Sequence, residues 1–132
     1  MLGEVLGEEQ GRVTSNRILS GESPTVETSF SARGKMLGVD TNEMGTYVAR
    51  MRPDGTLYGE GQGVIMSADG DAITWKGSGI GLFGAGGAIS YRGAIYYSTT
   101  SARFARLNKV AGVFEYEVDG EGNTVGKIWE WK

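Results

Sequence analysis

The sequence predicts an all-β fold, a single closed antiparallel up-and-down barrel of about eight strands. Glycine supplies 23 of the 132 residues, more than twice its usual share. These glycines are interleaved with aromatic and β-branched residues, and turn-forming residues interrupt the chain at short intervals. Half-buried strands joined by tight turns have this pattern, and the length fits one domain over residues 1–132.

The predicted turns are clusters of Gly, Pro, Asp and Asn. Proline fixes φ near the value that a turn needs, and glycine, asparagine or aspartate accepts the left-handed region. By this criterion the chain turns at residues 21–24, 40–42, 52–55, 68–71, 84–87 and 119–123. The segments between these turns are predicted to be strands.

The strands themselves are predicted from the alternation of apolar and polar side chains. After a weakly patterned first strand that ends near Leu19, strands are expected at residues 26–36, 46–52, 57–66, 73–83, 89–98, 110–118 and 124–131. The apolar face of the third strand carries Tyr47, and that of the fifth carries Trp75. The alternation does not decide which face of strands 57–66 and 89–98 is buried.

The last strand and the segment before the seventh have their own patterns. Residues 124–131 place Val125, Trp129 and Trp131 on one apolar face. Residues 98–109 break the strand rhythm and predict a long loop, or about one or two helical turns near residues 101–108. Its basic residues, which recur every third position, form either a solvated rim above an apolar pair or an anion site. They are Arg103, Arg106 and Lys109, and the apolar pair is Phe104 and Leu107.

Closure into a barrel is predicted from the connections and the glycines. Short connections make sequential strands antiparallel neighbours, and closing the sheet removes the exposed edges that an open sheet would have. Glycines at positions 59, 61 and 63 are expected to face glycines at 77, 79 and 81 on the neighbouring strand. Positions without side chains let a sheet coil tightly, which favours the barrel over the alternative, a β-sandwich.

Composition excludes several kinds of partner and location. A net charge of −3 and an isoelectric point near 5.0 give no overall attraction to nucleic acid or to an anionic membrane. No segment approaches the length of an apolar membrane span, and the acidic opening Met1–Gln10 does not resemble a signal peptide. We therefore expect a cytoplasmic protein with no nucleic-acid or membrane partner.

The chain contains neither cysteine nor histidine. A Ser-His-Asp triad, a Cys-His pair and histidine-ligated zinc are therefore excluded. Residues 79–84 match G-x-G-x-x-G, but a strand follows them where a dinucleotide site needs a helix. Residues 119–130 imitate a calcium loop but have Thr124 where that loop requires glycine. We expect no metal, no cofactor and, on balance, no enzymatic activity.

Glu60 is the most informative candidate for a site, because it lies mid-strand between two glycines. If its face is inward, a carboxylate lies in a largely apolar barrel and needs a partner. We predict that Glu60 points inward and pairs with Arg92 or Tyr96; the alternative is an ordinary surface glutamate. The predicted ligand-binding residues of the interior are Glu60, Gln62, Arg92, Tyr96, Tyr47 and Trp75.

Four segments resemble small bacterial and archaeal proteins of unknown function that have an allene-oxide-cyclase-like, calycin-like barrel. They are residues 58–63 (YGEGQG), 75–79 (WKGSG), 92–97 (RGAIYY) and 113–118 (VFEYEV), and the resemblance covers roughly residues 12–132. The resemblance implies a barrel with an internal cavity, often in an oligomer, and no established activity. A homo-oligomer is therefore expected.

Three functions remain open for such a barrel. The first is the non-catalytic binding of a small, mostly apolar molecule in the interior. The second is a cyclase or isomerase that uses a buried carboxylate or tyrosine as acid or base. The third is an oligomeric structural module with a filled interior. A filled interior favours the third function, an apolar cavity the first, and a cavity with a desolvated carboxylate the second.

Overall fold

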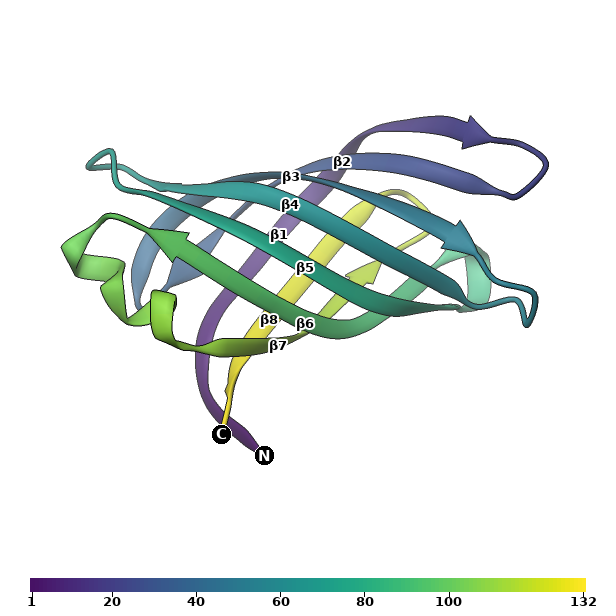
Figure 1. Cartoon of the computed structure of the whole chain (residues 1–132). Helices are drawn as coiled ribbons and strands as arrows, with labels where there is room; N and C mark the ends of the chain where they lie inside the picture. The colour runs from purple at the N-terminus through teal and green to yellow at the C-terminus, as the bar shows by residue number, and fades with distance from the viewer.

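The computed structural model describes residues 1–132 and confirms the all-β class (Figure 1). Eight strands form one closed barrel, in which each strand pairs with the next and β8 pairs with β1. The strands are β1 (Leu2–Ser20), β2 (Thr25–Met36), β3 (Val39–Met51), β4 (Leu57–Ser67), β5 (Ala72–Phe83), β6 (Ile89–Thr99), β7 (Ala111–Val118) and β8 (Asn123–Trp131). All pairs are antiparallel, and the closed ring rules out the sandwich alternative.

The second turn of the chain lies earlier than the sequence predicts. Residues 40–42 belong to β3, and the turn is formed by Leu37 and Gly38, with φ of 49° and 79°. A two-residue turn with positive φ at both positions matches the twist of the flanking strands. Because leucine seldom adopts this conformation, turn propensities point to the Asp-Thr-Asn cluster instead. The predicted turns at 52–55, 68–71 and 119–123 contain Gly55, Gly70 and Gly122, each with positive φ.

The last strand faces the opposite way from the prediction. Thr124, Gly126 and Ile128 face the interior, whereas Val125 and Trp131 are 54% and 59% exposed. The register explains this, because Gly126 lies opposite Glu9 of β1 and Tyr116 of β7. The Glu9 side chain fills the space beside Gly126, where a Cβ atom would lie 2.7 Å from Glu9 Oε1, so only glycine leaves it room. Apolar alternation along β8 therefore describes its outer face.

Two short 3-10 helices complete the chain, η1 (Ala85–Gly87) and η2 (Ala102–Lys109). Neither is long and apolar enough to cross a membrane. In η2, Phe104 and Leu107 are fully buried at the end of the barrel opposite the β1–β2 hairpin (Figure 1). The basic residues form ion pairs above them, Arg103 with Asp71 at 2.7 Å and Arg106 with Glu130 at 2.7 Å. Of the two interpretations of this segment, the structure therefore supports a solvated rim above an apolar pair.

Glycines on β3, β4 and β5 form a flat inner wall against which aromatic rings pack. The predicted pairing of glycines is confirmed for two pairs, since Gly59 lies opposite Gly79 and Gly61 opposite Gly77. It is wrong for Gly63, which lies opposite Trp75, and for Gly81, which lies opposite Leu57. A Cβ atom on Gly45 would lie 2.8 Å from the indole of Trp75, and one on Gly81 would lie 2.7 Å from the Tyr91 ring. Real Cβ atoms essentially never come that close, so the rings occupy the space that these glycines leave.

Candidate functional site

The alternation along β4 places the glycines inside and Glu60 outside. Leu57, Gly59 and Ile65 are buried, whereas Glu60 and Gln62 are exposed. The Glu60 carboxylate accepts a hydrogen bond of 2.9 Å from the hydroxyl of its outer-face neighbour Tyr58. The prediction that Glu60 points into the barrel is therefore wrong. The outer face of β4 carries more side-chain apolar area, but the inner face is covered by rings from other strands.

The predicted partners of Glu60 also lie outside. Tyr96 is 58% exposed, and Arg92 forms ion pairs with Glu117 at 3.4 Å and with Glu115 at 3.9 Å. These carboxylates belong to β7, the strand next to Arg92, so the pairs are cross-strand contacts on the surface. The inner face of β6 is formed instead by Tyr91, Gly93, Ile95 and Tyr97. Glu60, Gln62, Arg92 and Tyr96 therefore do not gather in the interior.

Replacing Glu60 tests this placement. We expect Glu60→Ala to change the free energy of unfolding by less than about 0.5 kcal/mol, because it removes only an exposed hydrogen bond. Urea denaturation of the variant and the wild type measures the difference. A loss of about 3 kcal/mol or more would show instead that the carboxylate is buried and partnered.

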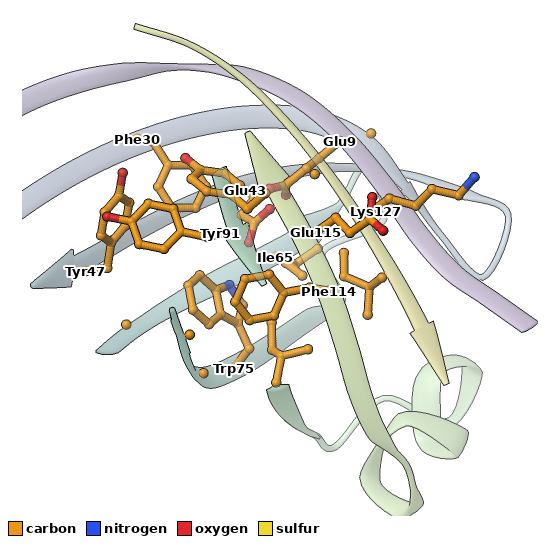
Figure 2. A pocket seen from close by; sticks show the side chains of 18 of the residues that line it. Glu9, Phe30, Glu43, Tyr47, Ile65, Trp75, Tyr91, Phe114, Glu115 and Lys127 are labelled. Atoms are coloured by element: carbon orange, nitrogen blue, oxygen red, sulfur yellow. The ribbon is translucent and has the colours of Figure 1, made fainter. Parts of the chain in front are cut away.

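Tyr47 and Trp75 do lie inside the barrel, where they help to line a cavity of about 90 Å³ (Figure 2). Most of the surface that lines the cavity is apolar, and 11 of its 26 lining residues are hydrophobic; the others are glycines and polar or charged residues. Among the hydrophobic residues are Phe30, Tyr47, Trp75, Tyr91, Phe114 and Tyr116. The barrel is thus not completely filled by its own side chains.

Glu9 of β1, a carboxyl that no pattern in the sequence indicates, also lines this cavity. Its neighbours across the ladder are Gly34 of β2 and Gly126 of β8, so neither adjacent strand places a side chain beside it. A Cβ atom on Gly126 would lie 2.7 Å from the Glu9 Oε1 atom. The two glycines therefore provide the space in which the Glu9 side chain lies.

Burial raises the pKa of Glu9 to about 7. The carboxyl accepts no hydrogen bond and forms no ion pair, so nothing in the protein compensates for the lost hydration of its charged form. Near neutral pH the protonated and ionised forms are therefore present in similar amounts. A carboxyl with this pKa can donate or accept a proton at the pH of the cell.

A second carboxyl, Glu43 of β3, lines the same cavity and is only 8% exposed. It too has neither a hydrogen-bond donor nor a basic partner within the protein. Figure 2 shows the Glu9 and Glu43 side chains pointing into the same part of the cavity from different strands. The interior thus holds two carboxyl groups that lack protein partners.

Polar groups without partners also occur on the aromatic side chains. The hydroxyls of Tyr97 and Tyr116 and the indole N–H of Trp75 are buried and form no hydrogen bond of normal geometry, although the Tyr116 hydroxyl has Tyr47 and Thr124 as neighbours. Burial is the main cause that raises the pKa of both tyrosines; the nearby Tyr47 raises that of Tyr116 further, and the charge of Glu9 raises both. Both hydroxyls therefore remain protonated. Most buried polar groups in proteins have partners, so these groups are free to form hydrogen bonds with water or a ligand in the cavity.

The rings around these groups form one continuous aromatic cluster. Phe30 and Tyr116 have ring centroids 5.4 Å apart, and Tyr47 lies 5.7 Å from Tyr91 and 5.9 Å from Tyr116 in edge-on contacts. The rings come from β2, β3, β6 and β7, so closure of the barrel is what brings them together. The cavity therefore combines an aromatic wall with two carboxyl groups.

The signal for Glu43 is present in the sequence, but it depends on the start of β3. Glu43 has the same parity as Gly45 and Tyr47, so an uninterrupted strand would place all three inside. Because the sequence predicts a turn at residues 40–42, the predicted strand begins after Glu43 and does not include it. No comparable signal exists for Glu9, because the alternation in β1 is weak and a register shift near Val5 and Gly7 interrupts it.

Comparison with known proteins shows a shared fold. No protein-family model matches the sequence, and no curated protein matches it. A protein of unknown function from Clostridium acetobutylicum ATCC 824 has a TM-score of 0.84 at 17% identity over 96% of both chains. A conserved protein of unknown function from Rhodopseudomonas palustris has a TM-score of 0.80 at 13% identity over 99% of both chains.

A solved structure described as an enzyme from Penicillium herquei also has this barrel. Its TM-score is 0.71 at 17% identity, over 97% of this chain and 92% of that chain. At such identities the similarity establishes the fold alone. The matches support the expected likeness to small barrel proteins of unknown function and do not confirm a likeness to allene oxide cyclases.

Proposed function

We propose that the barrel binds a compact, mostly apolar molecule in its interior. The observation that carries this proposal is a cavity whose walls are aromatic rings but whose polar groups lack partners in the protein. Apolar pockets with a few convergent polar groups are the usual form of small-molecule sites. The alternative of a filled structural barrel gains no support from a cavity of about 90 Å³.

The size of the cavity limits the ligand. Drug-sized ligands occupy pockets of roughly 300–1,000 Å³. A buried cavity of roughly 150 Å³ accommodates benzene, and a water molecule takes up about 30 Å³ of liquid. A cavity of about 90 Å³ therefore suits a molecule with few non-hydrogen atoms, such as a branched four-carbon compound, rather than a fatty acid.

Binding can be observed at the indole N–H of Trp75, which is buried and free of partners. We expect at least one of three compact probes, tert-butanol, tert-butylammonium and pivalate, to shift its NMR signal in a saturable titration. Trp75→Phe assigns the signal among those of the 3 tryptophans. If none of the probes shifts the signal, the proposed function is wrong.

A cavity-filling variant shows whether binding occurs inside the barrel. A Cβ atom on Gly59 would make only ordinary contacts, 3.5 Å from Tyr91 and 3.8 Å from the Val48 carbonyl. We therefore expect Gly59→Val to fold, to fill part of the cavity and to weaken probe binding at least tenfold. Gly21→Val is the matched control, because Gly21 has open space around it in an exposed turn. Unchanged binding in Gly59→Val would place the probe outside the barrel.

The second candidate function is acid–base catalysis of a cyclase or isomerase type, and the environment of Glu9 favours it. A general acid or base works best when its pKa lies near the working pH, and the pKa of Glu9 is about 7. The structural neighbour from Penicillium herquei is described as an enzyme, which is consistent with chemistry in a barrel of this shape. Catalysis by Glu9 requires that Glu9→Gln abolish turnover of a substrate that the variant still binds.

A further inference from the structure

The acidic side chains in the interior of the barrel have no basic partners. Glu9 and Glu43 line the cavity, whereas none of the 13 lysine and arginine side chains is buried and histidine is absent. Two lysines also line the cavity, Lys35 of β2 and Lys127 of β8, and both lie opposite Glu8, the residue before Glu9. Each of them pairs with an exposed carboxylate, Lys35 with Asp40 at 2.8 Å and Lys127 with Glu8 at 3.4 Å. No basic side chain therefore forms an ion pair with Glu9 or Glu43.

An ionised carboxylate without a partner in an apolar environment is unfavourable, mainly because it loses its hydrating water. A bound cation would compensate for that loss, whereas a bound anion would add to it. The hydroxyls of Tyr97 and Tyr116, buried at 7% and 8% exposure and without partners, can accept hydrogen bonds from an N–H donor. The complementary ligand is thus a donor with positive charge.

The aromatic wall favours the same kind of ligand. Faces of Trp, Tyr and Phe attract cations within about 6 Å, most strongly where water is excluded, and aromatic cages are a common site for ammonium ligands. Phe30, Tyr47 and Trp75 all line the cavity, with ring centroids 6.2 and 6.4 Å from Phe30 to the other two. The indole N–H of Trp75 is a hydrogen-bond donor and does not attract a cation, whereas the face of its ring does.

We propose that the ligand of the barrel is a compact organic cation, an alkylammonium group held by the Glu9 and Glu43 carboxylates with its alkyl part against the aromatic wall. This inference rests on the proposed binding function and adds the charge of the ligand to it. A free metal ion fits less well, because rings rather than oxygen ligands surround most of the cavity.

The test compares isosteric probes of different charge. At pH 8, above the pKa of Glu9, we expect tert-butylammonium to bind at least tenfold more tightly than tert-butanol, and pivalate more weakly than either. The NMR signal of the Trp75 indole reports all three titrations. If tert-butanol or pivalate binds as tightly as tert-butylammonium, the barrel binds small molecules but the inference about charge is overturned. If no probe binds, the proposed function fails as well.

Variants locate the source of the preference. We expect Glu9→Gln and Glu43→Gln each to bring the affinity for tert-butylammonium at pH 8 close to that for tert-butanol. The matched control is Glu117→Gln, which removes a carboxylate paired with Arg92 on the outer face and should leave the preference intact. A tenfold preference that survives in both interior variants would contradict the assignment of these carboxylates, and loss of the preference in Glu117→Gln would point to the outer surface.

Discussion

The Glu9→Gln variant is expected to be more stable than the wild type by about 3 kcal/mol at pH 8. Glutamine has the shape of the protonated carboxyl but cannot ionise. In the folded protein the pKa of Glu9 is about 7, against 4.5 for an unperturbed glutamate. The folded state therefore binds a proton that the unfolded state has already released between these two values. Since each unit of difference corresponds to about 1.4 kcal/mol, the wild type loses about 3 kcal/mol as the pH rises from 4 to 8.

The direction of this pH dependence distinguishes Glu9 from ordinary surface carboxylates. A carboxyl whose folded pKa is raised contributes stability that is lost as the pH rises, so the two proteins should converge near pH 4 and diverge toward pH 8. Urea denaturation at several pH values measures the difference. Glu8→Gln is the control, because Glu8 is the exposed neighbour and should change stability by less than about 1 kcal/mol. A difference between Glu9→Gln and the wild type that does not vary with pH would show that Glu9 is hydrated.

The loss of stability attributed to Glu9 also bears on function. Near neutral pH the Glu9 carboxyl destabilises the folded protein, so glutamine at this position would serve the fold better. Strongly shifted pKa values are concentrated at functional sites for this reason. Higher stability of Glu9→Gln together with loss of the cation preference would therefore identify a residue that trades stability for binding.

Phe104→Ala is expected to lower the free energy of unfolding by about 3–5 kcal/mol, as is usual for removing a fully buried ring. Phe104 has no exposed surface, and it packs at the end of the barrel beneath the guanidinium of Arg103, which lies 5.2 Å from the ring centroid. The fragment removed is large, and η2 is too short to refold around the cavity that would remain. A loss of this size is a substantial part of the roughly 5–15 kcal/mol that stabilises a typical domain.

Thermal or urea denaturation of Phe104→Ala provides the measurement. Lys109→Ala is the matched control within η2, because the Lys109 side chain is exposed and forms no ion pair; its expected effect is below about 0.5 kcal/mol. If Phe104→Ala lost less than about 1 kcal/mol, η2 would not close this end of the barrel, and the interior would be open to water there.

The sequence by itself determines the barrel and most of its turns, because both depend on local chemistry. Gly55, Gly70 and Gly122 adopt positive φ in turns that their neighbours predict. Alternation over residues 26–36 predicts Phe30 inside, and the structure confirms this. Strands that alternate in this way and follow one another through short turns can pair only as antiparallel neighbours. The same local alternation predicts Trp75 and Tyr47 in the interior.

The tertiary structure decides which face of the glycine-rich strands is inside. On β4 one face has glycine at three positions, and the other has Glu60 among larger side chains. Within β4, the face that carries Glu60 has more apolar side-chain area than the glycine face, so the β4 sequence alone predicts that this face is buried. In the barrel the rings of Trp75 and Tyr91, which belong to β5 and β6, cover the glycines and leave no room for Glu60. The inner face is therefore chosen by side chains from other strands.

The same reason explains why the carboxyls of the cavity escape a reading of the sequence. Glu9 is inside because its ladder neighbours on β2 and β8 are Gly34 and Gly126, which lie 25 and 117 positions away in the chain. Glu43 comes close to it only when β1, β2 and β3 curl into the closed sheet (Figure 2). Alternation along a strand shows which of its two faces is more apolar. The space inside a barrel, however, depends on the side chains that all the other strands place there.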